Sequence, residues 1–368
     1  MSDGPLFTIV TTTINVPTLL GDYAADALAH DRRVEQILVI GDRKTPPETA
    51  SYCDGLAAET GIAVRYVGVE DQESYLARWP EFAEFLPWNC IQRRNVGLLL
   101  AWDGDADIVV TIDDDNFLEQ ADYLGAHAHL GQELELEAVE SPTGWWNVCR
   151  MLEEARGIAF YHRGHPLSQR WHDDEWQLVE RRGRIVVNAG LWLDDPDVDA
   201  LARLYFPVCA TGPSEHYRDR LALAPGTWAP FNSQNTALLR EAIPAYLLFP
   251  HVGRYDDIWA SYVIRRIADA RGDLVTYGAP LVRQERNPHD YFKDFDAERL
   301  GLETNDVFLA ALHACDLGAG GYAEAFAAIA AEFPARIAEA CAAGGRDPAL
   351  FAQVADGLKL WAGIFTAQ

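Results

Sequence analysis

Three adjacent carboxylates, Asp113, Asp114 and Asp115, follow the apolar residues 108–112 in the stretch ADIVVTIDDDN. Neighbouring ionised carboxylates repel each other unless a cation or a hydrogen-bonding ligand lies between them. Because side chains alternate along an extended chain, we expect Asp113 and Asp115 to face one side and Asp114 the other. The pair suits Mg²⁺ or Mn²⁺ bridging the diphosphate of a nucleotide-sugar, and Asp114 suits a ribose hydroxyl. A solvated turn after a strand is the alternative.

Two arginines, Arg163 and Arg170, lie seven residues apart in RGHPLSQR, where Gly164 and Pro166 oppose a continuous helix. A guanidinium group can donate two parallel hydrogen bonds to phosphate oxygens, so the two arginines are candidates for clamping a phosphate. The alternative is a pair of salt bridges to the surplus carboxylates.

The segment GRYDDIWA places Asp256 and Asp257 at a predicted helix start. The helix dipole explains one of them as a cap, which leaves the other for acid, base or sugar-hydroxyl contacts. In NAGLWL, Gly190 allows close backbone approach and the ring of Trp192 could carry a sugar face. A tryptophan of the core is the alternative.

The elements that must position these residues alternate between strand and helix over residues 1–120, which predicts a mostly parallel sheet with helical crossovers. We expect strands at residues 6–14, 36–42, 63–69 and 107–113, and helices at 19–33 and 91–102. Thr12, Asp42 and Asp113 follow strand ends, where ligands of such sheets bind. Asp42 is a candidate contact to the base and would serve uracil or guanine.

Residues from about 140 to 300 are richer in Trp, Arg and Pro. They fall in the predicted sugar-binding half, 121–300, which follows the predicted nucleotide-binding half, 1–120. We expect a strand at 184–193 and a helix at 255–272 that ends at Gly272. Residues 301–368 are Ala-rich and predict a helical C-terminal appendage, broken at GAGG and AAGGRDP. It either packs on the core or makes a homo-oligomer contact.

The net charge of the 368 residues is -26 and the pI about 4.6, which argue against nucleic acid and anionic membranes as partners. The first residues show no charged-then-apolar signal pattern, and apolar runs fall short of the roughly 20 residues of a spanning helix. We therefore expect a cytoplasmic protein. The six cysteines lack metal-like spacing and are expected to be reduced.

Five blocks, in this order, resemble the plant reversibly glycosylated polypeptides, which are UDP-arabinopyranose mutases, and their bacterial relatives. The blocks are TIDDDN, RGHPLSQR, NAGLWLDDPDVDA, PFNSQNTAL and GRYDDIWA, and the similarity spans residues 7–288. The resemblance implies a glycosyltransferase-A-like (Rossmann-like) α/β domain over residues 1–300, with a mixed sheet flanked by helices. It also implies a Mn²⁺-type ion, with Mg²⁺ as the alternative, and interconversion of nucleotide-linked pyranose and furanose forms.

The resemblance also assigns roles residue by residue. It implies that Asp115 is a metal ligand together with Asp113, and that Arg163 is the reversibly glycosylated arginine with Arg170 as its companion. Arg94 falls on a phosphate or ribose contact, and Asn235 also matches. The family places a metal-binding His before an Asn-Pro pair, whereas His289 here follows Asn287 and Pro288. His289 is the candidate to replace that histidine as a metal ligand.

The resulting hypothesis is a mutase acting on a UDP- or GDP-linked sugar, such as UDP-arabinose or a GDP-6-deoxyhexose like GDP-rhamnose. A nucleophilic Arg163 would have to lose a proton, to Asp256 or Asp257, from a group whose reference pKa is about 12.5 to 13.8. A phosphate clamp is the other role for Arg163. The competing functions are a metal-dependent glycosyltransferase with a separate acceptor and a non-catalytic scaffold.

Overall fold

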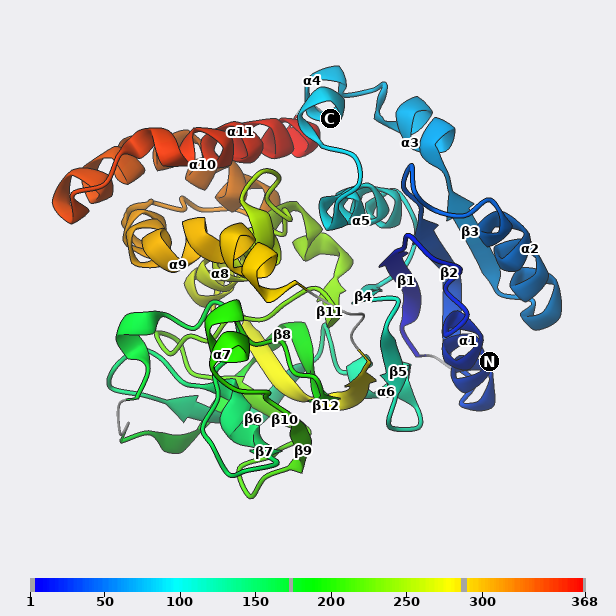
Figure 1. The fold of residues 1–368 in the computed structure, drawn as a ribbon, viewed down its shortest axis with the longest axis horizontal. Coiled ribbons are helices and arrows are strands. Elements are labelled where there is room, and N and C mark those ends of the chain that lie inside the picture. The colour runs from blue at the N-terminus through cyan, green and yellow to red at the C-terminus, as the bar shows by residue number, and fades with distance from the viewer. Residues whose placement is uncertain (1–3, 172–174, 286–289, 367–368) are drawn as a thin grey trace.

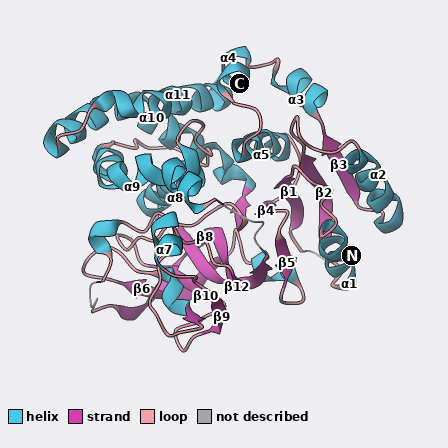
Figure 2. Ribbon diagram, in the orientation of Figure 1, coloured by secondary structure: helices cyan, strands magenta, loops and turns pink. Residues whose placement is uncertain are grey.

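The computed structural model describes residues 4–171, 175–285 and 290–366, and its fold is centred on one mixed sheet with helices around it (Figures 1 and 2). Parallel strands in the order β3–β2–β1–β4 make its first half. Their bounds are Leu6–Thr12 for β1, Arg33–Ile40 for β2, Ala63–Val67 for β3 and Ile108–Ile112 for β4. Every residue of β4 is buried, as expected for a branched, apolar strand covered on both faces.

Helices connect these strands as the alternating pattern predicted. They are α1 Leu20–Ala29, α2 Glu48–Thr60, α3 Val69–Leu76, α4 Pro80–Phe85 and α5 Arg94–Trp102. The helix expected at 91–102 begins as a separate short turn, η1 Ile91–Arg93. The crossovers bring the carboxyl ends of β1, β2 and β4 to one edge of the sheet.

The second half of the sheet is mixed because the long strand β8, Gln177–Asp194, pairs antiparallel with β6 and β11 and parallel with β12. The first part of β8 pairs with β6 and its second part pairs with β12. Strand β10 pairs with both β6 and β12, so the four strands form a closed ring of pairings. Strand β11 links both halves by pairing antiparallel with β4 and β8. The remaining bounds are β5 Asn116–Leu118, β6 Glu133–Glu140, β7 Leu152–Glu154, β9 Ala210–Pro213, β10 Arg220–Leu223, β11 Asn235–Leu239, β12 Leu274–Gln284, α6 Tyr123–His127 and α7 Ala200–Tyr205.

Helix α8, Asp256–Arg271, ends where predicted, because Gly272 takes a left-handed conformation with φ of 75°. The strand expected at 184–193 is the inner part of β8. The α/β class predicted from the sequence is therefore confirmed: a mixed sheet flanked by helices and followed by C-terminal helices.

The C-terminal helices are α9 Tyr291–Ala314, α10 Tyr322–Gly344 and α11 Ala352–Thr366. The boundary expected between residues 300 and 301 falls inside α9, where Gly301 packs against the ring of Tyr255. In α11 the indole of Trp361 is fully buried and donates to the Pro244 carbonyl at 3.0 Å. The tail thus packs on the core, which is the first of its two expected roles (Figure 1).

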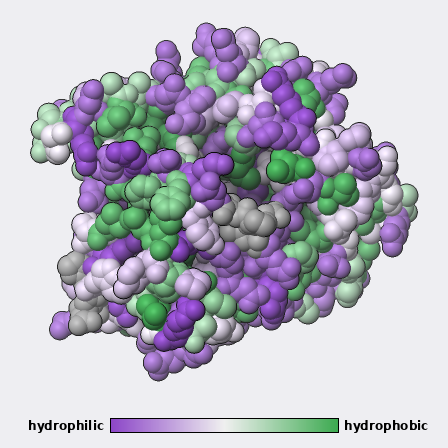
Figure 3. All heavy atoms as spheres, viewed as in Figure 1, coloured by the Kyte–Doolittle hydropathy of each residue, from purple (hydrophilic) through white to green (hydrophobic). Residues whose placement is uncertain are grey.

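Hydrophilic side chains cover most of the face in Figure 3, and hydrophobic ones form scattered groups. Within the described ranges, no helix combines the length and the apolar character needed to cross a membrane.

Leucines of the C-terminal segment provide a test of this packing. Leu358→Ala removes a fully buried side chain of α11 and should lower the free energy of unfolding by about 2–5 kcal/mol, because a cavity remains. Leu350→Ala, at a side chain that is 46% exposed, should change it by less than about 0.5 kcal/mol. Urea denaturation measures the free energy of unfolding of both variants. Equal effects of the two substitutions would contradict packing of the C-terminal helices on the core.

Candidate active site

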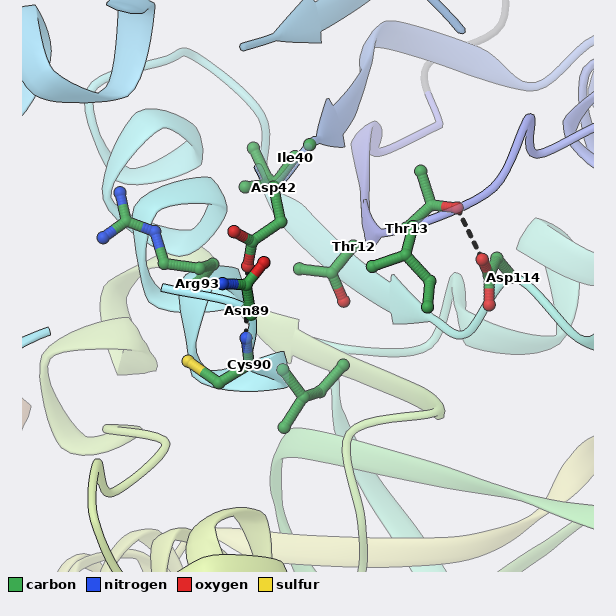
Figure 4. A pocket seen from close by; sticks show the side chains of 11 residues that line it. Thr12, Thr13, Ile40, Asp42, Asn89, Cys90, Arg93 and Asp114 are labelled. Atoms are coloured by element: carbon green, nitrogen blue, oxygen red, sulfur yellow. Dashed lines mark hydrogen bonds between the residues drawn. The ribbon is translucent and has the colours of Figure 1, made fainter. Parts of the chain in front are cut away.

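Two adjacent cavities lie at the carboxyl edge of the parallel strands. The first, called the small pocket, encloses about 250 Å³ and includes Thr12, Thr13, Asp42, Asn89 and Asp114 (Figure 4). The second, called the central cleft, encloses about 540 Å³ and includes Asp113, Asp115, Arg163, Asp197, Asp256 and Asp257. Both cavities share Asn89, Cys90 and Ile91 as lining residues, so one elongated ligand could occupy both.

The aspartate triplet is divided between these cavities, with Asp114 in the small pocket and Asp113 and Asp115 in the central cleft. This is the division that alternation along the chain predicted. Asp114 accepts a hydrogen bond from the Thr13 hydroxyl, as Figure 4 shows. Burial raises the pKa of Asp114 above its ordinary value.

Asp42 lies in the small pocket at the end of β2, as expected. Its carboxylate oxygens accept from the backbone N–H of Arg43 at 2.7 Å and of Cys90 at 3.1 Å. These bonds fix the carboxylate on the pocket wall and tie the loop before η1 to the end of β2. Its expected contact with a base stays a prediction.

Arg94 is wholly buried, and its guanidinium is hydrogen-bonded to other protein groups and does not line either cavity. Its Nη2 donates to Asp113 Oδ1 at 2.6 Å and to the Thr12 hydroxyl at 3.0 Å, and its Nη1 donates to the Ser233 carbonyl at 2.6 Å. The phosphate or ribose contact expected of Arg94 does not fit this burial. Its position instead fixes Asp113 and joins the ends of β1 and β4 to the segment before β11.

Arg163 enters the central cleft with its guanidinium held between two aspartates. It donates from Nε and Nη2 to Asp197 at 3.0 and 2.8 Å, and from Nη1 and Nη2 to Asp257 at 3.0 and 3.3 Å. Nη1 also donates to the Arg254 carbonyl. All five N–H groups therefore have acceptors.

The same aspartates decide the protonation of Arg163. Burial by itself lowers the pKa of the guanidinium, but the charges of Asp197 and Asp257 outweigh it and raise that pKa well above its ordinary value. Sequence reasoning did not single out Asp197. Its only signal was its place in DDPDVD, directly after the strand that contains Trp192.

Arg170 does not join Arg163 in the cleft. It forms an ion pair with Asp199, the N-cap of α7, and donates to the His165 carbonyl at 3.1 Å. Arg170 therefore ties its loop to α7, and the salt-bridge alternative describes it better than a phosphate clamp does.

Asp256 and Asp257 occupy the first turn of α8, but their side chains do not cap it. Asp257 accepts from Arg163 and from the Ser233 backbone N–H at 3.0 Å, whereas Asp256 accepts from Gln92 Nε2 at 2.7 Å. Burial, followed by the negative charge of Asp257, raises the pKa of Asp256 to about 7. Gln92 and Ser233 were not predicted, although Gln92 lies in the helix expected at residues 91–102 and Ser233 lies in the block PFNSQNTAL.

Gly190, Trp192 and Asn235 belong to the core, not to either cavity. Trp192 is 1% exposed, so it cannot carry a sugar face in this conformation. A Cβ at Gly190 would lie 2.3 Å from Asn235 Nδ2, and that amide donates to the Pro280 carbonyl at 2.9 Å. The close approach expected at Gly190 is thus made by the protein itself.

A divalent ion fits this cleft only in part. Asp113 and Asp115 supply carboxylate oxygens, which are the donors that Mg²⁺ and Mn²⁺ prefer. Among the described residues there is no group of three His, Cys, Asp or Glu side chains placed to hold a metal ion. His289, the candidate third ligand, lies outside the described residues. Water molecules and a bound diphosphate would supply further oxygen ligands.

No family model matches the chain. UDP-arabinopyranose mutase 3 of Arabidopsis thaliana is 31% identical over 182 residues, which are 47% of this chain and 46% of the relative. Probable UDP-arabinopyranose mutase 2 of Solanum tuberosum is also 31% identical, over 47% of this chain and 45% of the relative. The chain thus spans about half the length of the curated relatives it matches. It is a distant homologue of the plant UDP-arabinopyranose mutases.

Two solved structures resemble it in fold alone. Glucosyl-3-phosphoglycerate synthase from Mycobacterium tuberculosis, in complex with phosphoglyceric acid, is 13% identical with a TM-score of 0.42 and covers 84% of this chain and 80% of its own. A mannosyltransferase from Pyrobaculum calidifontis, in complex with GDP-Man and Mn²⁺, is 14% identical with a TM-score of 0.43 and covers 100% of this chain and 82% of its own.

Replacing Arg163 tests the buried ion pairs. Arg163→Ala leaves Asp197 and Asp257 without their shared cation, so the free energy of unfolding should fall by about 3–5 kcal/mol. Arg299→Ala removes an arginine whose pair with Glu303 is exposed on α9 and should have little effect. Guanidinium denaturation compares the two, and a stable Arg163→Ala protein would refute the buried network.

Proposed function

We propose that this distant homologue of the plant UDP-arabinopyranose mutases interconverts the pyranose and furanose forms of a nucleotide-sugar while keeping the nucleotide bound. The observation that carries the proposal is the central cleft, which gathers Asp113, Asp115, Arg163 and Asp257. These residues come from three of the sequence blocks on which the family resemblance rests. Such a reaction needs a cation at the departing diphosphate and acid–base groups at the sugar, and the cleft offers groups of both kinds.

The ligand would occupy both cavities. We place the nucleoside in the small pocket near Asp42 and Asp114, and the diphosphate at Asp113 and Asp115. The lining residues shared by the two cavities support one continuous ligand. A bound Mn²⁺ or Mg²⁺ would supply positive charge that stabilises the leaving diphosphate. A panel of UDP- and GDP-sugars distinguishes uracil from guanine as the base and identifies the sugar.

Arg163 has two candidate roles. As a nucleophile, its nitrogen would bond to the anomeric carbon while the carbon–diphosphate bond breaks, and its proton would pass to Asp257 or Asp197. Both carboxylates already accept N–H groups of Arg163, which supports that route for the proton. The raised pKa opposes it, since each unit costs about 1.4 kcal/mol. As a fixed cation, Arg163 needs no proton transfer, and the present hydrogen bonds favour this role.

A panel of nucleotide-sugars tests the function directly. The protein with Mn²⁺ and each UDP- or GDP-sugar, without an acceptor, should produce a new isomer of unchanged mass on chromatography. Nucleoside diphosphate released only when an acceptor is added would replace the proposal by glycosyl transfer to that acceptor. No change of any substrate under either condition would contradict both functions.

The role of the divalent ion can be tested with one aspartate. Asp115→Asn should lower the isomerisation rate by about 100-fold or more, because a ligand of the charge-stabilising ion is weakened. Chelation by EDTA should have a similar effect on the unmodified protein, reversed by added Mn²⁺. Asp54→Asn, at an exposed site on α2, is the matched control and should retain the full rate. Unchanged activity after both treatments would exclude a metal role.

A further inference from the structure

Three carboxylates face a single guanidinium in the central cleft. Asp197 and Asp257 both bind Arg163 directly, so their two negative charges already exceed its one positive charge. Asp256 lies in the same cleft and is 3% exposed. Among the ion pairs of the described residues, none includes Asp256. A third negative charge at this place has no ion-pair partner of its own, because the nearby Arg163 is already paired with Asp197 and Asp257.

The hydrogen bonds separate the roles of the three carboxylates. Asp257 accepts from Arg163 and from both the backbone N–H and the hydroxyl of Ser233, at 3.0 and 3.3 Å. Asp197 accepts from Arg163 and from Asn232 Nδ2 at 2.8 Å. Several donors of this kind stabilise an ionised carboxylate.

Asp256 has a different environment. Its Oδ2 accepts from the neutral amide of Gln92 at 2.7 Å. That bond persists whether the carboxyl is ionised or protonated, because the carbonyl oxygen of a carboxylic acid still accepts. The side chain can therefore gain or lose a proton without breaking its anchor, which the other two carboxylates cannot do without loosening Arg163.

We propose that Asp256 is the proton carrier of the cleft: its carboxyl gives a proton to the oxygen released as the old ring opens and regains a proton from the sugar hydroxyl that closes the new ring. The inference rests on the proposed function. During interconversion the carbon–diphosphate bond and the old ring C–O bond break, and a new ring C–O bond and the carbon–diphosphate bond form. One hydroxyl loses a proton and another oxygen gains one, so a single carboxyl balances the reaction without a co-reactant.

The electrostatics of the cleft agree with this assignment. Burial raises the pKa of Asp256 to about 7, and the charge of Asp257 adds to the effect while Arg163 opposes it. A group that titrates near neutrality exchanges protons most effectively at that pH. The titratable and polar groups that line the central cleft together with Asp256 from other elements are Gln92 of η1, Asp113 and Asp115 after β4, Arg163, Asp197 and Arg254 of the short helix η5, Gly253–Tyr255.

The first experiment measures protonation without any substrate. Because the pKa of Asp256 is raised in the folded protein, its contribution to stability is present at low pH and is lost as the pH rises from about 4 to about 7. Asp256→Asn keeps an oxygen acceptor for Gln92 but cannot ionise. The melting temperature of the wild-type protein should therefore fall relative to Asp256→Asn between about pH 5 and 7 and stay level above about pH 7.5.

A matched variant controls for surface charge in this experiment. Asp356→Asn removes an exposed carboxylate of α11 and should show no such relative fall. A constant difference between wild type and Asp256→Asn at every pH would mean that Asp256 does not hold a proton near neutrality, and the proposal would be abandoned.

The second experiment measures the reaction. Asp256→Asn should bind the nucleotide-sugar with a Kd within about twofold of wild type and should lower kcat by about 100- to 10,000-fold. The limb of the pH–rate profile near pH 7 should disappear with it. Wild-type kcat in this variant would overturn the inference and leave the mutase proposal intact. If the wild-type protein isomerises no member of the panel, the proposed function fails and the catalytic role of Asp256 fails with it.

Discussion

The structure depends on pairing the positive charges of two buried guanidinium groups, those of Arg94 and Arg163, with carboxylates and other hydrogen-bond acceptors. Arg94 binds Asp113 and the Ser233 carbonyl, the Ser233 N–H and hydroxyl bind Asp257, and Asp257 binds Arg163. A buried charge costs several kcal/mol unless partners of opposite charge and hydrogen bonds surround it. These contacts therefore act as one connected network at the central cleft, in which removal of one charged member leaves another charge without its partner.

This network also explains the arrangement of the cleft. Arg94 contacts the ends of β1 and β4 and the segment before β11, while Asp257 connects that segment to α8 and Arg163. The strands supply a rigid edge, and the network fixes the loops that extend beyond it. Because Asp197 and Asp257 already compensate Arg163, Asp256 is left as the carboxyl with a neutral partner. One constraint thus produces both the fixed charges and the group able to exchange a proton.

Sequence reasoning succeeded where the signal was local. Alternation along an extended chain correctly separated Asp114 from its two neighbours, and the conformational freedom of Gly272 marked the end of α8. It failed where partners are remote: the spacing of RGHPLSQR gave no sign that Arg170 would turn to Asp199. It also failed for Trp192, since an aromatic ring suits a sugar face and a core equally well until its neighbours are known.

The sequence by itself determined the mixed α/β class, the order of most elements, the helical tail and the segments from which the cleft is built. The signals concerned are runs of branched apolar residues, helix periodicity and terminating glycines. Each acts over a few residues, so it can be recognised from the sequence alone. Only the tertiary structure decided which carboxylate meets which cation. The contacts concerned join residues 34, 94 and 164 positions apart, from Arg163 to Asp197, from Arg163 to Asp257 and from Gln92 to Asp256. Their choice depends on burial and on competing acceptors, which exist only once the chain has folded.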